Sequence, residues 1–460
     1  MNSEQNKIDM LHGSLWNKIP LFALPVAATA ILEQLFNASD VAIVGNFTGA
    51  SRTIAVAAVG ANSFIISLIV NFFIGIALGV NVVIANAIGR DDKKAIHQAV
   101  HTAIVMSVIG GVLVTILGEL VSGALLNSLQ VPDEVFPYAL LYLRIYLLGM
   151  PVILLYNFEA AIFRSIGETK TPLKALALSG VLNVLFNLFF VIVLHMTVDG
   201  VAVATVISNA ISSVLLFRKL RRTNKEIHLD VHALRIHADS LKRILQIGIP
   251  AGIQSAVFSI ANIVIQSAIN SLGTVVMAAS SAAFNIEVFA YDVLNSFSQA
   301  CTTFVGQNFG AGQFKRCRKV MGLCLIENAI ASGTTIILVL MFGHSLLAIF
   351  TNDPEVIAIG YTRLVLIFTS YLFSMVYEVM SGYLRGFGIS LAPALLTTVG
   401  VCGTRLLWIY FVFPTSRTFR TIMTAYPVSL CITAILILIA LLVCRPSSRF
   451  ARLQAQNGNL

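Results

Sequence analysis

The sequence has few charged residues. Asp, Glu, Lys and Arg make up only 11% of its 460 residues, against about 25% in ordinary soluble domains. Hydrophobic residues make up 57% of the chain. Such a composition cannot cover a water-facing surface in the usual way, so we predict a protein that lies in a lipid bilayer.

The motifs of enzymes are also missing. The sequence contains no H-E-x-x-H pair, no phosphate-binding loop and no nucleophile elbow. No segment between its apolar tracts is long enough to hold a soluble catalytic domain. We therefore predict that the chain is not an enzyme, that it needs no cofactor, and that ATP is not its energy source.

Cysteine and histidine show no ligand pattern. The six cysteines all lie in the second half without C-x-x-C spacing, which indicates small packing residues rather than disulfides or metal ligands. His97 and His101 are four residues apart but lack the Glu of a zinc motif. We expect both on the solvated surface.

Long apolar tracts, in contrast, are abundant. Each is long enough, at around 20 residues, to cross a bilayer as a helix. Six occur in each half, which predicts an all-α membrane protein with twelve transmembrane helices. The tracts lie at residues 19–45, 54–84, 97–120, 137–163, 172–195, 200–217, 244–271, 275–306, 317–342, 359–383, 391–413 and 421–444.

The two halves repeat each other. The tract LYNFEAAIFRSIGETKTP (155–172) returns as VYEVMSGYLRGFGISLAP (376–393), with Tyr, Arg, Gly and Pro in the same register. Because six helices is an even number, the two halves have the same orientation in the membrane and form parallel repeats. We predict six-helix lobes at 1–220 and 244–460, the second with a short cytoplasmic tail, and a cytoplasmic linker at 221–243.

Basic residues predict the orientation. Of the 30 Lys and Arg residues, 24 fall in residues 1–18, in alternate loops or in the tail. Cytoplasmic loops carry the excess of Lys and Arg, so we predict that both termini are cytoplasmic. The net charge of +9 then needs no nucleic-acid partner. The six others are assigned to opposite loops (Arg52, Arg363, Arg417, Arg420) or to apolar tracts (Arg144, Arg405).

Acidic residues inside apolar tracts are the first site candidates, because a charge in hydrocarbon is costly. Glu33, Asn37 and Asp40 follow one another at helical spacing on the tract 19–45. Such a stripe faces a protein interior, either as a coupling site or as a packing stripe satisfied by neighbouring helices. Asp40 needs a partner such as a proton or a metal ion.

Neutral oxygen donors lie on two further tracts. Asn183 and Asn187 are four residues apart, and Thr205 lies on the next tract. A carboxylate with amide and hydroxyl oxygens suits a hard cation, so Asp40, Asn183 and Asn187 could bind Na⁺. Alternatively, Asp40 carries a proton, and the Asn pair makes interhelical hydrogen bonds. The residues leave both readings open.

A second polar set predicts a substrate-lining surface. It contains acids that could line a cavity for a cationic substrate, or that could instead be buried and hydrogen-bonded to Tyr and Ser. Its members are Glu378, Tyr377, Glu159, Asn157, Glu287 and Asp292. Two prolines, Pro25 and Pro250, recur early in the tracts 19–45 and 244–271. Proline permits bending, so we predict hinges there, and bending at Pro25 would move Asp40.

Several tracts resemble the multidrug and toxic compound extrusion (MATE) transporters. They are FNASDVAIVGNFTGA (36–50), GETKTPL (167–173), GVAVATVIS (200–208), FVGQNFGAG (304–312) and YLRGFGISLAP (383–393). The resemblance covers almost the whole chain and implies two six-helix lobes around a central cleft.

Within that family the chain is similar to the DinF-like bacterial branch. This resemblance implies coupling at Asp40, with Asn183 and Thr205 in the same site. The branch often has a second aspartate where this chain has Asn187. The NorM-like branch has an acid in the seventh helix, whereas residues 244–271 contain none.

We therefore expect a monomeric multidrug efflux antiporter in the cytoplasmic (inner) membrane. It would export small organic cations or amphiphiles in exchange for H⁺ or Na⁺ by alternating access of the lobes. The alternative is a flippase for a lipid-linked or amphiphilic substrate. A large anionic headgroup calls for a basic cavity, and the intramembrane residues here are mostly acids, which favours cationic cargo.

Overall fold

The computed structural model describes residues 7–49, 52–223 and 226–457, and these residues form helices and connecting segments with no strand. Within them, eleven helices are long and apolar enough to cross a membrane. A twelfth span is formed by α4 (Phe136–Leu148) and α5 (Met150–Ser165), which are bent by 50° relative to each other. The predicted all-α fold with twelve spans is confirmed.

The helices follow the predicted order. The first half contains α1 (Lys18–Phe47), α2 (Arg52–Gly89), α3 (Lys93–Ser128), α4, α5, α6 (Lys170–Leu188), which continues as a π-helical segment (Phe189–Val193), and α7 (Val198–Arg222). The second half contains α8 (Ala238–Asn270), α9 (Thr274–Gly310), α10 (Phe314–Ala348), α11 (Pro354–Gly386), α12 (Leu391–Thr397), α13 (Thr404–Leu407), which lies between two π-helical segments, α14 (Phe419–Cys444) and α15 (Pro446–Asn457).

Helix ends extend beyond the apolar tracts. α7 continues to Arg222 and α8 begins at Ala238, so the segment between them is shorter than the predicted linker 221–243. Lys and Arg stems can lie along apolar surface while their charged ends reach water, and a helix can therefore continue past the last apolar residue. Residues 224–225 of that linker, and the terminal residues 1–6 and 458–460, lie outside the described residues.

The chain divides into two compact units. Unit 1 contains Met1–Ile8, Ala28–Ile88 and Asp92–Leu245, and unit 2 contains Asp9–Ala27, Gly89–Asp91 and Gln246–Leu460. Helix α1 is thus divided after Ala27, two residues beyond Pro25, and α8 is divided after Leu245, shortly before Pro250.

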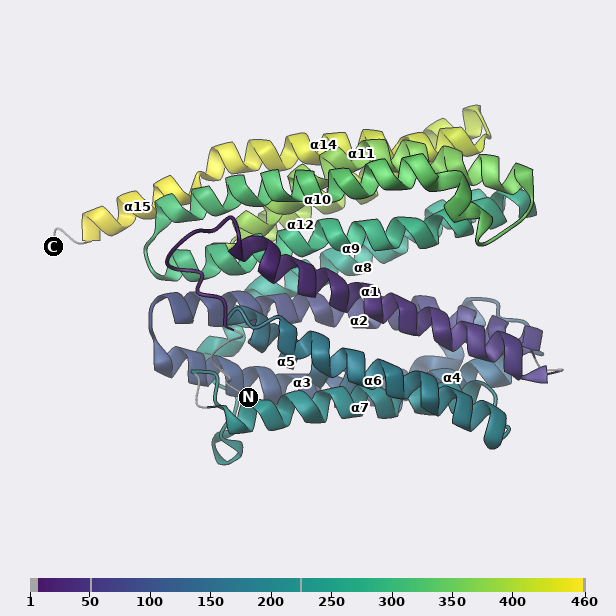
Figure 1. The fold of residues 1–460 in the computed structure, drawn as a ribbon, viewed down its shortest axis with the longest axis horizontal. Helices are drawn as coiled ribbons and strands as arrows, with labels where there is room; N and C mark the ends of the chain where they lie inside the picture. Colours follow the sequence, from purple (N-terminus) through teal and green to yellow (C-terminus); the bar gives the residue numbers. More distant parts are fainter. Residues whose placement is uncertain (1–6, 50–51, 224–225, 458–460) are drawn as a thin grey trace. The chain divides into compact units, whose positions relative to one another are not determined.

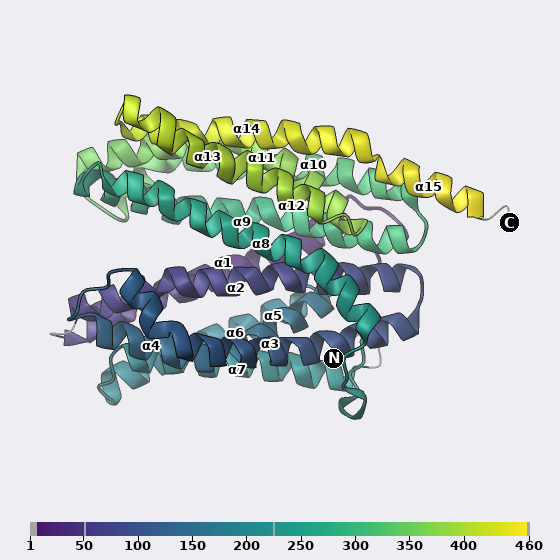
Figure 2. The ribbon, with the colours of Figure 1, turned by 180° about the vertical axis from the view of Figure 1, so that it is seen from behind.

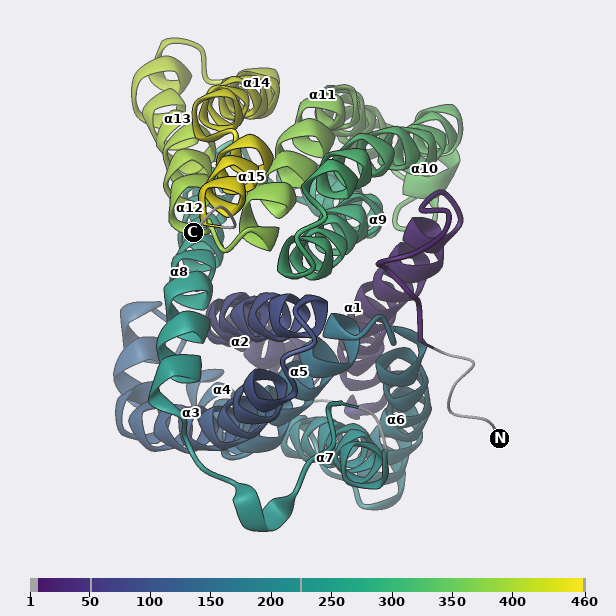
Figure 3. The same cartoon turned by 90° about the vertical axis from the view of Figure 1, so that its left-hand side faces the viewer.

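In unit 1, α3 packs on α5, and α7 packs on α4, α5 and α6 (Figures 1 and 3). A close approach joins α1 to α6, since a Cβ atom at Gly180 would lie 1.6 Å from Cζ of Phe36. Only glycine allows the Phe36 ring to lie against α6. This contact brings the part of α1 that carries Asp40 beside the part of α6 that carries Asn183.

In unit 2, α11 packs against α9, α10 and α14 (Figure 2). Gly382 allows α11 to approach α9 closely, because a Cβ atom there would lie 2.5 Å from the Ser298 carbonyl oxygen. The start of α1 also belongs to this unit, where Phe22 meets Phe304 edge to face with ring centroids 5.8 Å apart.

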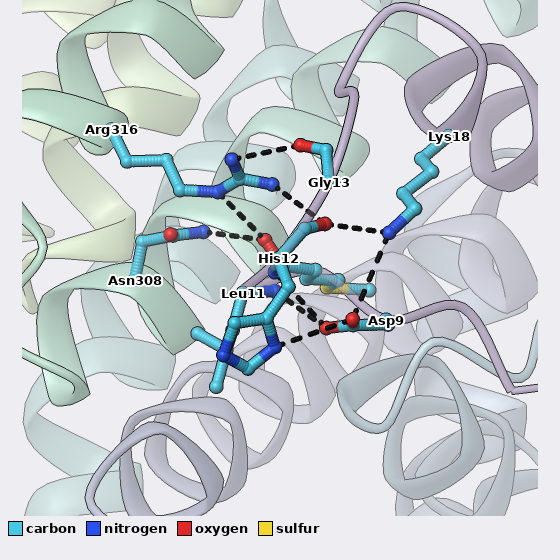
Figure 4. Close-up of polar contacts among 8 residues, drawn as sticks. Asp9, Leu11, His12, Gly13, Lys18, Asn308 and Arg316 are labelled. Atoms are coloured by element: carbon cyan, nitrogen blue, oxygen red, sulfur yellow. Dashed lines mark hydrogen bonds and ion pairs between the residues drawn. The ribbon is translucent and has the colours of Figure 1, made fainter.

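The segment before α1 is held by two side chains of unit 2 (Figure 4). The Arg316 guanidinium donates to the carbonyl oxygens of Met10 (3.2 Å), His12 (3.1 Å) and Gly13 (3.0 Å). The Asn308 amide also donates to the Met10 carbonyl oxygen at 3.1 Å. We call residues 9–13 the N-terminal segment.

Two placements correct the sequence analysis. Arg363 is buried inside α11 rather than in a loop. His101 is also buried rather than solvated: its Nδ1 lies 2.7 Å from the His97 carbonyl oxygen and its Nε2 lies next to the backbone of Asp230. In both cases a polar side chain that the sequence assigned to water has its partners inside the protein.

Candidate functional site

Asp40 lies inside unit 1 with partners from two other helices. Its Oδ1 accepts a hydrogen bond from Nδ2 of Asn187 at 2.5 Å, and its Oδ2 accepts one from Oγ1 of Thr205 at 2.9 Å. Asn183 completes the cluster, with its Oδ1 3.1 Å from Asn187 Nδ2 and its Nδ2 3.3 Å from Thr205 Oγ1. All four side chains are buried. The structure therefore brings together Asp40, Asn183, Asn187 and Thr205.

One oxygen of this cluster has no donor. The Oδ1 atom of Asn187 is buried and makes no hydrogen bond within the described residues. Buried polar atoms are nearly always hydrogen-bonded, so an unpartnered one calls for an unseen partner such as a water or an ion. Next to a carboxylate, a free acceptor oxygen suits a cation or a proton carrier.

The atoms of the Asp40 cluster that could bind a cation are oxygens, with one carboxylate among them. Nowhere in the described parts of the chain do three His, Cys, Asp or Glu side chains gather closely enough to hold a metal ion. Asp40 is the one carboxylate of its cluster, and the other oxygens come from amides and a hydroxyl. Such a set suits transient binding of Na⁺, but it lacks the ligands of a permanent transition-metal site.

The polar stripe of α1 is not brought together as a whole. Glu33 is half-buried and interacts electrostatically with Arg164. Asn37 is exposed and has no hydrogen-bond contact with the Asp40 cluster among the described residues. Asn37 lies about 60° around the helix axis from Asp40 at 3.6 residues per turn, and this rotation takes it away from α6 and α7.

Glu159 on α5 is enclosed within unit 1. Its exposed fraction is 0%, and its Oε2 accepts a hydrogen bond from Oγ of Ser213 on α7 at 3.1 Å. Asn157 is half-buried and donates to the carbonyl oxygen of Ile153 in its own helix at 2.9 Å. Neither side chain makes a hydrogen bond to the Asp40 cluster in the part of the chain that is described.

Glu378 on α11 has partners inside unit 2. Its Oε1 accepts from the Tyr291 hydroxyl at 3.1 Å, and its backbone carbonyl oxygen accepts from Ser298 at 2.7 Å. Tyr377 is buried beside it. The acid also interacts electrostatically with Arg385, whose Nη2 donates to Gln254 at 2.8 Å. Glu378 is therefore the centre of a network of Tyr, Arg and Gln.

Glu287 on α9 is paired with a cation. Arg363 donates to its Oε2 through Nε at 3.1 Å and through Nη2 at 2.7 Å, and donates through Nη1 to Ser280 at 2.6 Å. Both side chains are almost wholly buried. The charge of Glu287 is therefore matched inside the protein. Asp292, five residues further along α9, is half-buried.

The alternative that these acids are hydrogen-bonded to Tyr and Ser agrees with Tyr291 at Glu378 and Ser213 at Glu159. Arg363 as the partner of Glu287 was missed: it was assigned to a loop, although the predicted apolar tract 359–383 contains it. Ser213 and Tyr291 carry no sequence signal that separates them from packing residues. Pro25 and Pro250 lie inside α1 and α8, and their role as hinges stays a prediction.

Comparison with known proteins decides the family. The MatE family model matches residues 25–189 and again residues 250–411. The chain belongs to the MatE family. The two matches fall on the two halves, in agreement with the sequence repeat. As a MATE chain it is a membrane transporter and not an enzyme, as predicted.

Relatives of the MATE chain span nearly its full length. The probable multidrug resistance protein YoeA of Bacillus subtilis is 26% identical over 402 residues, covering 85% of this chain and 86% of that protein. The probable multidrug resistance protein NorM of Thermotoga maritima is 27% identical over 389 residues, covering 84% and 82%. The chain is therefore a multi-pass protein of a multidrug efflux family, which acts on small molecules in the cell membrane.

A solved structure has the same fold. A crystal structure of a MATE protein in the bent conformation aligns with a TM-score of 0.88 over 97% of this chain and 99% of that one, at 20% identity. The likeness confirms the MATE fold of two repeated lobes that the sequence resemblance implied.

Proposed function

We propose that this MATE transporter is a secondary antiporter that exports organic cations and amphiphiles and is driven by an ion that binds at Asp40. The observation that carries the proposal is the Asp40 cluster: a buried carboxylate on α1 whose partners, Asn187 and Thr205, are neutral. An intramembrane acid without a fixed countercharge requires a mobile cation to neutralise it.

The geometry favours a proton as this ion. Both Asp40 oxygens face hydrogen-bond donors, the Asn187 amide nitrogen and the Thr205 hydroxyl. A bound Na⁺ needs oxygens turned toward it instead. Na⁺ remains the alternative, since the Asn183 and Asn187 amides would supply such oxygens after rotation.

The membrane potential can drive export of a neutral substrate in exchange for a cation. One charge that crosses ~100 mV releases about 2.3 kcal/mol. A monovalent cationic substrate exchanged one for one would cancel this electrical contribution, and the chemical gradient of the ion would then drive export.

For the cargo we propose a cationic or amphiphilic small molecule. Glu287 is matched by Arg363, so the acidic character of unit 2 depends mainly on Glu378 with Tyr377, and on Asp292. A flippase for an anionic lipid-linked substrate is the second candidate, and the three arginines buried in unit 2 (Arg363, Arg385 and Arg405) are the observation that favours it.

We also propose the topology and the moving parts. Both termini lie in the cytoplasm of a monomer in the cytoplasmic membrane, with lobes at 1–220 and 244–460. Pro25 and Pro250 act as hinges, which is supported by the division of α1 and α8 between the two units close to each proline.

The test uses purified protein in lipid vesicles with an imposed H⁺ or Na⁺ gradient and ethidium as the cationic probe. We expect the H⁺ gradient to drive ethidium movement and Asp40→Asn to abolish it. Asp199→Asn is the matched control, because Asp199 is also in unit 1 but, among the described residues, accepts hydrogen bonds from Thr197 alone, at the start of α7. Normal gradient-driven movement in Asp40→Asn would refute the assignment of coupling to Asp40.

A further inference from the structure

A buried polar stripe runs along α7, away from the Asp40 cluster. Thr205, Ser208, Ser212 and Ser213 are buried, and Asn209, half-buried, lies four residues from both Thr205 and Ser213. Positions three or four apart share one face of a helix. Thr205 and Ser213 are eight residues apart, which is about 12 Å along the axis. The stripe ends at a second acid, because Ser213 donates to Glu159.

Packing alone explains part of this stripe but not its end. Ser208 donates to the Ala204 carbonyl oxygen at 2.7 Å, and Ser212 donates to the Ser208 carbonyl oxygen at 3.2 Å. These hydroxyls are satisfied by their own helix, as small packing residues often are. Ser213 differs, because it donates to a carboxylate on another helix.

Two buried polar atoms at this depth have no partner. The Oε1 atom of Glu159 and the hydroxyl of Tyr156 make no hydrogen bond within the residues that the structure describes. Both belong to α5 and, three residues apart, lie on one face of it. Two such atoms side by side in an apolar helix bundle require water or a proton to satisfy them.

Glu33 on α1 lies near Tyr156, one of these α5 side chains. It precedes Asp40 by seven residues, or about 10 Å along the helix, and it interacts electrostatically with Tyr156 and with Arg164. Two helices, α1 and α7, thus lead from the Asp40 cluster to one group of side chains on α5. Glu159 lies six residues before Ser165, the last residue of α5, and Ser213 lies nine residues before the end of α7 at Arg222.

We propose that Glu159, with Glu33 and Tyr156, is a second proton station, through which a proton leaves Asp40 toward the basic end of unit 1. The idea rests on the proposed proton coupling and deepens it. The O–H bond on Asp40 breaks as one forms on the first of a chain of waters, each water passes a proton to the next, and the last water gives a proton to the carboxylate of Glu159. Glu159 releases it to water at the basic end, so water is the one co-reactant.

This assignment changes the role of Glu159. A fully enclosed acid cannot contact cargo, and so Glu159 acts on the ion rather than lining the substrate path. Glu33, which is half-buried and interacts electrostatically with Arg164, is the partly exposed acid of the station.

The experiment separates proton flux from substrate handling. Vesicles that contain a pH-sensitive dye report proton movement when ethidium is added, while exchange of labelled for unlabelled ethidium without a gradient reports substrate movement alone. We expect Glu159→Gln to lower proton flux by about a hundredfold, the lower end of the ~10²–10⁴-fold contribution of a positioned acid–base group, with ethidium affinity and exchange unchanged. Glu33→Gln and Tyr156→Phe should lower it less.

The matched control is Glu119→Gln. Glu119 is another acid of unit 1, but it is paired with Arg144 at 3.4 Å on α3 and α4, and its loss should leave proton flux unchanged. If Glu159→Gln does not fold, Glu33→Gln and Tyr156→Phe decide the matter.

Two outcomes are distinguishable. Normal proton flux in all three variants, with Asp40→Asn inactive, overturns the second station but leaves the coupling site intact. Proton flux that persists in Asp40→Asn overturns the proposed coupling and the station with it. Equal loss of exchange and proton flux in Glu159→Gln, together with normal flux in Glu33→Gln and Tyr156→Phe, also overturns the station.

Discussion

The two units treat their buried acids differently. In unit 1, Asp40 and Glu159 receive hydrogen bonds from neutral side chains, an amide and two hydroxyls. In unit 2, Glu287 is held by Arg363, and Glu378 interacts with Arg385 as well as Tyr291. Asp40 and Glu159 thus have no fixed cation beside them, whereas Glu287 and Glu378 lie near arginines. Glu327 on α10 is the exception in unit 2, since it is buried and neither of its carboxylate oxygens has a hydrogen-bond partner within the described residues.

The repeat explains how the difference arose without changing the fold. In the register of the repeat, Asp40 corresponds to Ile265, which is buried in α8. Asn187 corresponds to Trp408, whose indole donates to the Thr421 carbonyl oxygen at 2.8 Å. At these equivalent positions unit 2 therefore has apolar or aromatic side chains where unit 1 has Asp40 and Asn187. The proposed division of coupling and cargo recognition between the units rests on this difference.

The largest effect, on thermal stability, is expected from breaking the buried ion pair of Arg363 and Glu287 in unit 2. Arg363→Gln leaves Glu287 buried without its cation, and removal of one partner of a buried pair costs about 3–5 kcal/mol. We expect a marked fall in the thermal unfolding temperature of the detergent-solubilised protein. Asp40→Asn in unit 1 removes a charge that has no fixed partner, and should leave that temperature unchanged or raise it.

A double variant checks the cause. Arg363→Gln combined with Glu287→Gln removes both charges, so most of the lost stability should return. If Asp40→Asn destabilises the protein as much as Arg363→Gln does, the two units do not differ in the way described.

The next effect concerns the neutral donors of unit 1. Thr205→Val removes the hydroxyl that donates to Asp40 at 2.9 Å but keeps the shape of the side chain. A hydrogen bond to a charged group contributes about 1.5–3 kcal/mol, so we expect gradient-driven ethidium transport to fall by about tenfold or more. Thr205→Ser keeps the donor and is the control. Equal activity of the Val and Ser variants would exclude a role for this hydrogen bond.

A smaller effect is expected from the hinges. Pro25 and Pro250 are related by the repeat, but α1 carries acids on the C-terminal side of its proline, whereas α8 has no acid between Pro250 and its end at Asn270. Pro25→Ala restores a backbone donor and stiffens α1, so we expect transport to slow several-fold while ethidium affinity remains. Pro250→Ala should slow it less. The measurement is the initial rate of ethidium movement in vesicles for each variant, and a larger loss in Pro250→Ala would reverse the comparison.

Much of this organisation could be predicted from the sequence. Bilayer thickness fixes the length of an apolar tract, so the number of spans was readable, and an Arg-Gly-Pro pattern repeated in one register revealed the two halves. Helix ends could not be predicted, because the stems of basic residues let α7 continue to Arg222. The Asp40 cluster was predicted because its members are polar in otherwise apolar tracts.

The partners of the other acids could not be predicted. Whether Glu287 is free or paired depends on a contact between α9 and α11, and no sequence spacing reports it. Arg363 seemed to belong to a loop, although α11 spans 33 residues. Asn37 shows the opposite error, since helical spacing placed it with Asp40 but the packing of α6 and α7 left it out.

The smallest effect concerns Asp9, an exposed acid of unit 2 whose charge is stabilised by neighbouring groups of the protein. Asp9, in the N-terminal segment, accepts from the backbone N–H of Leu11 (3.0 Å) and His12 (3.2 Å) and lies 3.8 Å from Lys18 Nζ (Figure 4). Partial burial alone would raise the pKa of Asp9, but these N–H donors and the charges of Lys18 and His12 outweigh it and hold the pKa below the usual 3.8.

Since the folded state lowers this pKa, Asp9 stabilises the segment at pH values above 3.8, and the contribution disappears as the pH falls through the lowered value. Asp9→Asn should therefore speed hydrogen exchange of the Leu11 and His12 amides a few-fold at neutral pH, and the difference from the wild type should vanish in acid. Asp353→Asn, which alters a cap on α11, should leave both amides unchanged. A difference that persists below the lowered pKa would show that the fixed partners do not act through the charge of Asp9, and matching by fixed groups in unit 2 would then be limited to its buried acids.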